Sequence, residues 1–317
     1  MLDRPPSLVV LGIYAADLTL LTPRLPAWGE TVLGSAARLG PGGKGSNQAV
    51  AAARLGARVA LLAKLGADPF AAAARALYAA EGVETEFVFE TTTAATGTAA
   101  ILVDAARGEN AIVVVPGAAA ALGAEEIALA EGRIAAADGF LTQLELPTAL
   151  VADGLARARR HGVRTLLNPA PAAPLEDTLL GMVDVLTPNE SEAETLTGIA
   201  IDGPEAAARA AAALAARGVG AVVITLGPRG ALAFAEGTAR LVPAHQAGAV
   251  VDTTGAGDCF SAALAVALAE GQPLAAAATF ACRAAGIQVT RPGTAPAMPY
   301  RREVTPPAPA RSSPPRA

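Results

Sequence analysis

Cysteine, aromatic residues and basic charge are all scarce in this sequence. Its two cysteines, Cys259 and Cys282, are too few for a disulfide framework, so we expect a reducing cytoplasmic environment and treat both as small core residues. Lys and Arg number 24 against 29 Asp and Glu, which argues against nucleic-acid binding because that needs clustered excess basic side chains. We find no signal peptide and no apolar run long enough to span a bilayer, so we expect no membrane partner.

The chain is rich in small apolar residues. Hydrophobic residues make up 52% of it and charged residues 17%, which is enough apolar material for a large core. Much of this content is alanine, which predicts closely packed helices. The length of 317 residues would suit about two domains of usual size but also fits one large α/β domain, which we place over residues 1–304. The Pro-rich residues 305–317 lack a periodic apolar face and predict a disordered tail.

Short β-branched segments alternate with longer Ala-rich segments. Fully apolar strands separated by helices are typical of a parallel sheet covered on both faces, which binds ligands at the carboxyl ends of its strands. The predicted strands are 7–11, 59–63, 139–142, 165–168, 183–187 and 221–225, with a hairpin of 231–235 and 239–242. The predicted helices are 47–55, 69–80, 149–160, 191–196, 204–217, 258–270 and 274–288.

Three strand-like segments, 31–39, 98–104 and 110–115, interrupt this alternation, and the gap at 105–109 has the length of a hairpin turn. They predict a small antiparallel sheet inserted into the α/β body, which could serve as a lid over a ligand. We expect the lid strands within residues 13–41 and 87–117.

The segment DTTGAGDCFSAAL at residues 252–264 is the strongest local signal. Gly255 and Gly257 precede a predicted helix, where backbone N–H groups and the helix dipole can hold an anion. Asp258 could cap this helix, or it could accept a proton from a hydroxyl that attacks a bound phosphate. Asp252, at the expected end of a strand, could form a turn or bind a cation.

A second glycine-rich segment, GPGGKGSNQ at residues 40–48, precedes the first predicted helix. It could be a simple turn, or it could let the backbone approach a polar ligand with Lys44 and Asn47 as donors. It is not a Walker A loop, because Gly45 stands where Ser or Thr is required. The turn at 255–257 is not a dinucleotide fingerprint, because Phe260 stands where a third small residue belongs.

Polar residues near other strand ends give weaker signals. Asn189 and Glu192 are typical of a capped helix with an acidic first turn, and Glu145 places a carboxylate after a strand. His161 and His245 lie outside all of these segments, so we expect neither a Ser-His-Asp triad nor a zinc site.

Together these segments resemble the ribokinase (PfkB) family of sugar kinases, from Leu8 to about Tyr300. The first family signature is similar to GGKGSNQAVAAARLGA at residues 42–57, and the second is similar to DTTGAGDCFSAAL. The segments LNPAPA at 167–172, TPNESEAETLTG at 187–198 and VTRPGTAP at 289–296 are similar to bacterial ribokinases in particular. The resemblance implies a ribokinase-like three-layer α/β/α fold, with a mostly parallel central sheet and a small antiparallel β lid.

The resemblance also implies roles for individual residues. Asp258 would be the catalytic base, and Gly255, Ala256 and Gly257 would form the anion hole. The sugar would contact Ala15, Asp17, Gly43, Lys44, Gly45, Ser46, Asn47, Glu145 and Asp258. ATP would contact Asn189, Thr225, Leu226, Gly227, Pro228, Arg229, Gly230, Gly257 and Cys282, while Glu192 would help to organise Mg²⁺. An activating K⁺ would be held by Asp252, Thr254, Gln288, Arg291, Gly293 and Ala297, several of them through backbone carbonyls.

The lid of this family often forms a dimer interface as well. Val32, Leu33, Ile101 and Val113 are apolar residues of the predicted lid, and a sheet this thin cannot bury both of its faces. The sequence therefore predicts a homodimer in which two copies pair through their lids.

The sequence departs from the ribokinase pattern at two positions. Ala15 stands where ribokinases carry an Asn that binds a sugar hydroxyl and where deoxyribokinases carry an apolar residue; Tyr14 or a water could replace that contact. Cys282 stands where ribokinases often have a His near adenine. From the resemblance we predict γ-phosphoryl transfer from ATP to O5 of ribose. Because Ala15 replaces the Asn, 2-deoxyribose, a nucleoside and a hexose remain alternative acceptors.

Two other classes of protein are less consistent with the sequence. A Rossmann oxidoreductase needs Gly-x-Gly-x-x-Gly after its first strand, where this chain has only Gly12. A non-catalytic sugar sensor should have lost either the base or the anion hole, and both are present.

Overall fold

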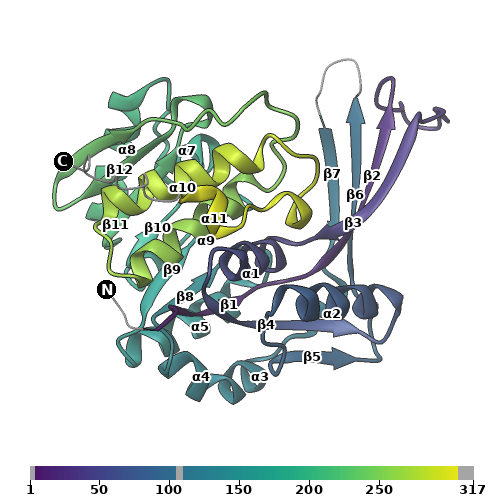
Figure 1. Ribbon diagram of the computed structural model, residues 1–317, viewed down its shortest axis with the longest axis horizontal. Helices are drawn as coiled ribbons and strands as arrows, with labels where there is room; N and C mark the ends of the chain where they lie inside the picture. The colour runs from purple at the N-terminus through teal and green to yellow at the C-terminus, as the bar shows by residue number, and fades with distance from the viewer. Residues whose placement is uncertain (1–3, 105–109, 306–317) are drawn as a thin grey trace, which may run out of the picture.

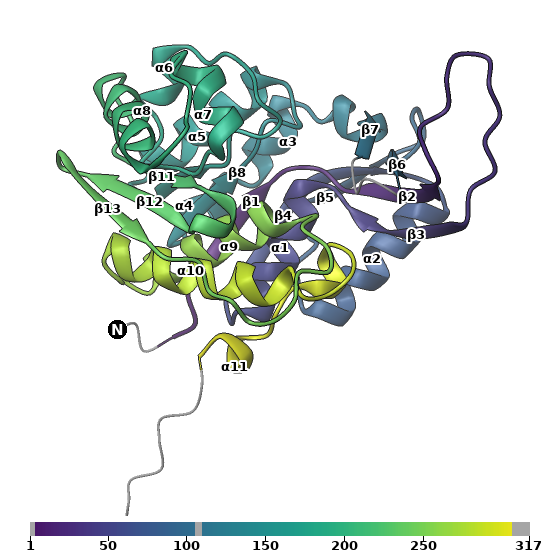
Figure 2. The same cartoon turned by 90° about the horizontal axis from the view of Figure 1, so that it is seen from above.

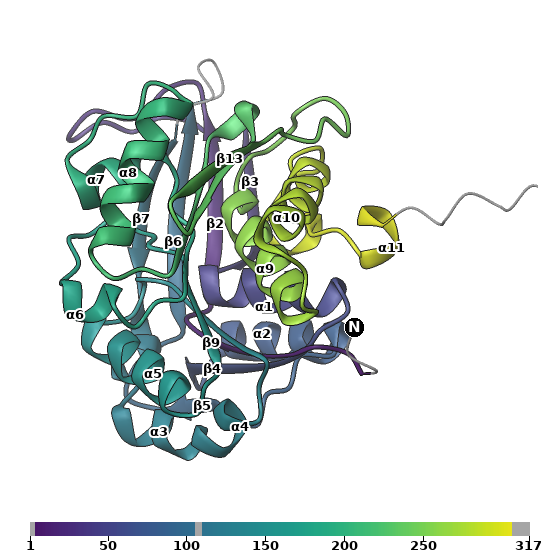
Figure 3. The same cartoon turned by 90° about the vertical axis from the view of Figure 1, so that its left-hand side faces the viewer.

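The computed structural model describes residues 4–104 and 110–305, and there a large sheet lies between two layers of helices (Figure 1, Figure 3). Its strands lie in the order β13-β12-β11-β10-β9-β8-β1-β4-β5. Neighbours from β11 to β5 are parallel, whereas β12 and β13 form an antiparallel hairpin at one edge. The strands are β1 (Ser7–Leu11), β4 (Arg58–Gly66), β5 (Val88–Thr91), β8 (Gly139–Thr142), β9 (Arg164–Leu167), β10 (Val185–Leu186), β11 (Ala221–Thr225), β12 (Ala231–Ala235) and β13 (Thr238–Val242). The predicted mostly parallel sheet with a terminal hairpin is confirmed.

Each face of the sheet buries alternate residues of the same strand. In β1, Leu8 and Val10 belong to the core on one face, and Val9 and Leu11 belong to the core on the other. One face packs against α1 (Lys44–Arg54), α2 (Pro69–Glu81), α9 (Ala256–Ala269) and α10 (Leu274–Gln288). The other packs against α3 (Ala124–Leu129), α4 (Glu131–Ala135), α5 (Thr148–Arg160), α7 (Glu190–Thr197) and α8 (Pro204–Ala216). Shorter elements are α6 (Asp177–Leu180), α11 (Arg301–Val304), and the 3₁₀ turns η1 (Gly117–Ala121), η2 (Gly227–Arg229) and η3 (Ala295–Ala297).

Alanine takes the place of larger side chains where α9 and α10 pack together. Ala262, Ala263, Ala277, Ala278 and Ala281 are all fully buried. Small side chains let two helices approach closely and still fill the space between them. The core is therefore well filled although the chain has few aromatic residues.

A second, smaller sheet rises from one side of the body as the predicted lid (Figure 1). Its strands lie in the order β3-β2-β6-β7. The outer pairs β2–β3 and β6–β7 are antiparallel, while the central pair β2–β6 is parallel. The strands are β2 (Ala15–Thr22), β3 (Ala36–Gly42), β6 (Gly97–Asp104) and β7 (Asn110–Val115). The hairpin expected at 105–109 lies outside the described residues.

One predicted strand in the first half of the lid is misplaced. β2 was not predicted, and the strand placed at 31–39 begins instead at Ala36. Residues 23–35 form a long loop that projects beyond the lid, with an ion pair between Arg24 and Glu30 and a fully exposed Trp28 (Figure 2). Val32 and Leu33 are therefore loop residues and not part of a lid strand.

The two faces of the lid differ in exposure. Register pairs place Leu18, Leu39, Ala100 and Val113 in one row on the outer face, and the three larger side chains of this row are exposed. Ile101 lies on the opposite face and is buried. Of the four apolar residues named from the sequence, only Val113 lies in the outer face of the sheet.

Five further elements were also not predicted, namely β5, α3, α4, α6 and α11. α3 and α4 are short and follow each other with a single residue between them, so neither carries the long helical periodicity that a sequence pattern needs. No helix in the described parts of the chain is long and apolar enough to cross a membrane. Of the tail expected at 305–317, only Thr305 lies within the described residues.

Candidate active site

The two glycine-rich segments meet where the N-terminal ends of α1 and α9 lie beside each other. Asn47, in the first turn of α1, donates from Nδ2 to Oδ2 of Asp258 in α9 at 2.9 Å. Gln48 donates from Nε2 to Oδ1 of the same carboxylate at 3.2 Å. The amide of Ser46 donates to the carbonyl of Ile13, which ties α1 to the end of β1.

Asp258 does not cap its helix. α9 begins at Ala256 with Gly255 as its N-cap residue, and Asp258 lies in the first turn with its carboxylate turned toward α1. The capping interpretation is therefore wrong. Burial raises the pKa of Asp258, while the positive charge of Lys44 and the hydrogen bonds from Asn47 and Gln48 act in the opposite direction.

The glycine turn before α9 needs a backbone conformation that favours glycine. Gly255 has φ = 81°, and a Cβ there would lie 3.4 Å from atoms of Met298 and Thr294. The N–H of Ala256 turns back to the carbonyl of Thr253 at 3.2 Å. Gly255 and Gly257, but not Ala256, line the cavity beside Asp258.

This polar cavity has a volume of about 160 Å³ and lies at the carboxyl ends of the central strands. Asp258, Lys44, Asn189 and Glu192 line it, as the sequence predicted for ligand-binding residues. The other lining residues are Asn168, Ala170, Thr187, Thr225, Gly255, Gly257 and Ser261. Of these, Asn168, Ala170, Thr187 and Ser261 were not predicted.

A signal for the missed residues was available in the sequence. Asn168 and Thr187 each follow the last residue of a strand, and Ser261 lies one helical turn after Asp258. The hydroxyls of Thr187 and Ser261 lie 2.9 Å apart, which joins the end of β10 to α9.

A larger cavity of about 550 Å³ lies next to the first, and Thr225 and Gly257 line both. Its walls are mostly apolar and include Phe260, Cys282 and Val289. Of the residues predicted to contact ATP, it is lined by Thr225, Gly227, Pro228, Gly230, Gly257 and Cys282. Ala256 and His245 also line it, and His245 was not predicted to lie in a site.

Two residues predicted to contact ATP do not line either cavity. Leu226 is buried in the core, and Arg229 forms an ion pair with Glu190 and donates to the carbonyl of Asp202. Arg229 therefore holds the turn η2 against the N-terminal end of α7.

Asn189 and Glu192 form the predicted helix cap. The side chain of Asn189 accepts from the N–H of Glu192, and Oε2 of Glu192 accepts from the N–H of Asn189, each at 2.8 Å. Because both residues also line the polar cavity, the cap fixes a carboxylate at its wall. Burial raises the pKa of Glu192.

Several carboxylates lie near Lys44, including Asp17 of the lid strand β2 and Glu145. The backbone N–H of Lys44 donates to Oε2 of Glu145 at 2.7 Å. Burial, together with the charge of Asp258, raises the pKa of Asp17 to about 6 and that of Glu145 to about 7. The pKa of the Lys44 ammonium is raised by Asp258, Glu145, Glu192 and Asp17, although its burial acts in the opposite direction.

The glycines of the first signature are required by close packing. A Cβ on Gly42 would lie 2.0 Å from Oδ2 of Asp17, and Gly43 has φ = 83°. Gly45 packs against the backbone of Gly12, and Ser46 is fully buried with no hydrogen-bond partner for its hydroxyl. Ala15 lies two residues before Asp17 in β2, so both side chains face the same side of the lid.

Comparison with known proteins identifies the family. Residues 5–301 match the pfkB family carbohydrate kinase domain. The chain belongs to this family. It is therefore an ATP-dependent sugar kinase, and the oxidoreductase interpretation is wrong.

Curated relatives of this pfkB family chain include several sugar kinases. It is 39% identical to a ribokinase of Haemophilus influenzae, with 94% of this chain and 96% of the relative covered. It is 40% identical to a ribokinase of Bacillus subtilis, with 94% and 98% covered. A deoxyribokinase of Salmonella typhi is 35% identical, with 90% and 94% covered.

Solved structures of ribokinases share the fold. The Arabidopsis thaliana ribokinase complexed with ribose and ATP superposes with a TM-score of 0.84 at 31% identity, covering 95% of this chain and 97% of that one. The ribokinase of Thermotoga maritima gives 0.83 at 31% identity, covering 95% and 98%. The predicted ribokinase-like fold is confirmed.

The segment predicted to hold K⁺ in this pfkB family chain is built around two carbonyls. Gln288 donates from Nε2 to the carbonyls of Thr254 at 2.7 Å and Gly293 at 3.2 Å. Asp252 accepts from the N–H groups of the same two residues, each at 2.9 Å. Asp252 lies in an irregular segment and not at the end of a strand as predicted. Arg291 forms an ion pair with Glu303.

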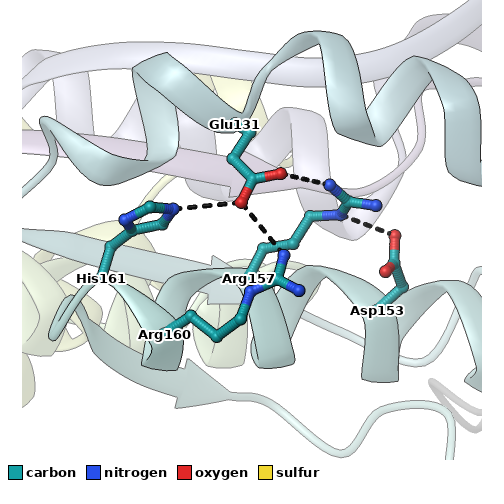
Figure 4. A network of polar contacts seen from close by, with 5 residues as sticks. All are labelled: Glu131, Asp153, Arg157, Arg160 and His161. Atoms are coloured by element: carbon teal, nitrogen blue, oxygen red, sulfur yellow. Dashed lines mark hydrogen bonds and ion pairs between the residues drawn. The ribbon is translucent and has the colours of Figure 1, made fainter.

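The two histidines lie far apart in the fold. His161 belongs to a surface network in which Glu131 of α4 contacts His161, Arg157 and Arg160 beside α5 (Figure 4). His245 lines the larger cavity. Within residues 4–104 and 110–305, no three His, Cys, Asp or Glu side chains form a metal-binding group.

Proposed function

We propose that this chain is a ribokinase, which transfers the γ-phosphoryl group of ATP to O5 of ribose. One observation carries the proposal: the buried carboxylate of Asp258 lies beside Lys44 and the Gly255 turn, in a polar cavity that adjoins a larger apolar one. Relatives at 39% and 40% identity over almost the whole chain are ribokinases, which supports ribose as the acceptor.

Asp258 is the proposed base. Its carboxylate accepts two amide N–H groups and so keeps a fixed orientation toward the cavity. As O5 attacks the γ-phosphorus, Asp258 takes the O5 proton, the new O–P bond forms and the bond to ADP breaks. The N–H groups of Gly255 and Gly257 at the start of α9 and the ammonium of Lys44 would balance the negative charge that develops on the phosphoryl oxygens.

The proposed arrangement of ATP follows from the two cavities. The apolar walls of the larger cavity, with Phe260 and Val289, suit a flat adenine ring. Thr225 and Gly257 line both cavities, so the phosphates can extend from one into the other. Mg²⁺ bound with ATP would supply charge neutralisation, and Glu192 is the carboxylate placed to organise it. Both oxygens of Glu192 already accept from Asn189, at 2.8 and 3.0 Å, which fits an indirect role.

The residues proposed to hold K⁺ fit a monovalent cation. The carbonyls of Thr254 and Gly293 converge on Nε2 of Gln288, and the buried Oε1 of Gln288 has no hydrogen-bond partner, so rotation of this amide would free both carbonyls to bind a cation. Carbonyl oxygens around one point suit a hard cation. A cation at this position would stiffen the turn that leads into Gly255, which is three residues after Asp252.

The sugar is proposed to lie between Lys44 and the lid. Asp17 and Glu145 supply acceptors for its hydroxyl groups, while Ala15 offers none on the same face of β2. Tyr14 packs edge-on against Tyr78, with ring centroids 6.4 Å apart, and both rings belong to the core. A deoxyribokinase function is less favoured, because the deoxyribokinase relative, at 35% identity, is less similar than the ribokinases of Haemophilus influenzae and Bacillus subtilis.

We also propose a homodimer that forms through the outer face of the lid. The exposed side chains of Leu18, Leu39 and Val113 lie in one row there, which would give two copies a self-complementary apolar surface.

The proposed location of the protein is the cytoplasm. Its two cysteines are free and buried, which is consistent with a reducing environment.

A coupled assay of ADP release with ribose, 2-deoxyribose, a nucleoside and a hexose tests the proposed function. We expect the highest kcat/KM with ribose. Turnover only with a nucleoside or a hexose would contradict the proposal.

A further inference from the structure

Gln48, which follows Asn47 in α1, lies at the centre of a chain of buried side-chain amides. Its side chain is fully buried. Nε2 donates to Oδ1 of Asp258 at 3.2 Å and to Oδ1 of Asn168 at 3.3 Å. Its Oε1 accepts from Nε2 of Gln143, which follows the last residue of β8. Gln48 thus links the ends of two central strands to the proposed base.

The direction of this chain is set by a backbone carbonyl. The carbonyl of Thr187 can only accept, and Nδ2 of Asn168 donates to it at 3.0 Å. Asn168 must then present Oδ1 to Gln48, and Gln48 must present its N–H group. Because that group also points at Asp258, the chain ends by offering the carboxylate a donor. This is the arrangement that an ionised carboxylate, an acceptor only, requires.

We propose that Gln48 is a positioning residue, whose carboxamide holds the carboxylate of Asp258 as a proton acceptor although it is buried. Asn47 fixes the other oxygen, so Asp258 can rotate only by losing one of two hydrogen bonds. This inference rests on the proposal that Asp258 is the base. It adds Gln48 to the reaction although Gln48 does not line the cavity, and it gives Gln143 and Asn168 the role of orienting Gln48.

Several charged groups also act on Asp258, so the effect of Gln48 must be separated from theirs. Lys44 in α1 favours the ionised carboxylate. Carboxylates approach from the lid strand β2, from the segment after β8 and from α7, and they disfavour it. These groups are Asp17, Glu145 and Glu192, while the neighbouring Cys259 thiol is buried with its pKa raised. A substitution at Gln48 leaves all of these charges in place.

The test is the pH dependence of kcat in the full-length Gln48→Leu variant, with saturating ribose and MgATP. A hydrogen bond to a charged group is worth about one to two pKa units. We therefore expect the acid limb of the profile to move up by about one to two pH units, with kcat recovering at high pH as Asp258 ionises. KM for ATP should stay within about twofold, because Gln48 does not line the larger cavity.

Controls separate positioning from a structural effect. Gln272, which donates to Glu270 beyond the C-terminal end of α9, offers the matched substitution Gln272→Leu, which should leave the profile unchanged. If Gln48→Leu does not fold, Gln143→Leu should give a smaller shift in the same direction. An equal loss of kcat at every pH, or an unchanged profile, would overturn the inference. If Asp258→Asn is inactive while the Gln48 profile is unchanged, only this inference fails; an active Asp258→Asn refutes the proposed base itself.

Discussion

Asn47 and Asp258 are separated by 211 positions in the sequence, yet they share a 2.9 Å hydrogen bond between two buried side chains. This contact joins the two glycine-rich segments into one site. It also means that α1 and α9 must keep their relative position for the carboxylate to stay oriented, so the packing of these two helices is part of the catalytic apparatus.

The first prediction concerns the base. Asp258→Asn keeps the shape of the side chain but removes the group that accepts the proton, so kcat should fall by about 10²- to 10⁴-fold. Steady-state kinetics on a variant with a normal melting temperature measures this. Asp153→Asn, on the surface of α5 where Asp153 pairs with Arg157, should retain normal kcat. Near-normal turnover of a folded Asp258→Asn enzyme would remove Asp258 from the mechanism.

The second prediction concerns the pH dependence of stability. Glu145 has its pKa raised from 4.5 to about 7, so the folded protein binds a proton that the unfolded chain has lost between these values. Stability therefore falls as the pH rises through this window. Glu145→Gln should raise the free energy of unfolding at pH 7.5 by roughly 1–3 kcal/mol and weaken sugar binding. Denaturant unfolding at pH 5 and 7.5 measures this, and equal differences at both pH values would refute it.

The third prediction concerns the monovalent cation. Because the carbonyls of Thr254 and Gly293 hold the segment next to the glycine turn, kcat should be higher in potassium chloride than in tetramethylammonium chloride at equal ionic strength. The melting temperature should rise in the same salt, since the cation binds the folded state. Equal rates in the two salts would argue against a cation site.

The fourth prediction concerns the lid dimer. Val113→Asp places a charge in the exposed apolar row with Leu18 and Leu39, so the dimer should dissociate at micromolar concentration in sedimentation velocity. Leu129→Asp, at an exposed position on α3 away from the lid, provides a matched control that should remain dimeric. A wild-type protein that sediments as a monomer would contradict the proposed interface.

The fifth prediction concerns Ala15. A sugar hydroxyl buried without a partner costs roughly 1–3 kcal/mol, which corresponds to about a 5- to 150-fold loss of affinity. The preference for ribose over 2-deoxyribose should therefore be weak, and Ala15→Asn should shift kcat/KM toward ribose. A wild-type preference for ribose above about 100-fold would show that another group replaces the missing contact.

The sequence predicted the main sheet because its strands are apolar on both faces, as β1 illustrates with Leu8 and Val9 in different cores. It did not predict β2, which has a pattern of mixed exposure and begins soon after β1, with only Gly12, Ile13 and Tyr14 between the two strands. The outer face of the lid is exposed, so its strands are not buried on both sides as those of the main sheet are. Their local sequences therefore carry less of the burial pattern from which strands are recognised.

The residues alone predicted two separate segments, and only the family resemblance placed them around one sugar. The local pattern left Asp258 undecided between a helix cap and a base, because that choice depends on contacts with residues in α1; the resemblance, not the pattern, assigned it as the base. Gln48 was missed for the same reason. No local sequence pattern marks a side-chain amide as functional. The role of Gln48 arises from Gln143, Asn168 and Asp258, which are all far away in the sequence.

The chain contains a single tryptophan, Trp28, which is fully exposed in the loop between β2 and β3. Indole emission depends on the polarity around the ring, so all of the tryptophan fluorescence of this protein originates beside the lid. Pairing of two lids, or movement of the lid over a sugar, would change the surroundings of this one ring and of no other. The protein thus carries an intrinsic optical probe at the part of the structure that is expected to move.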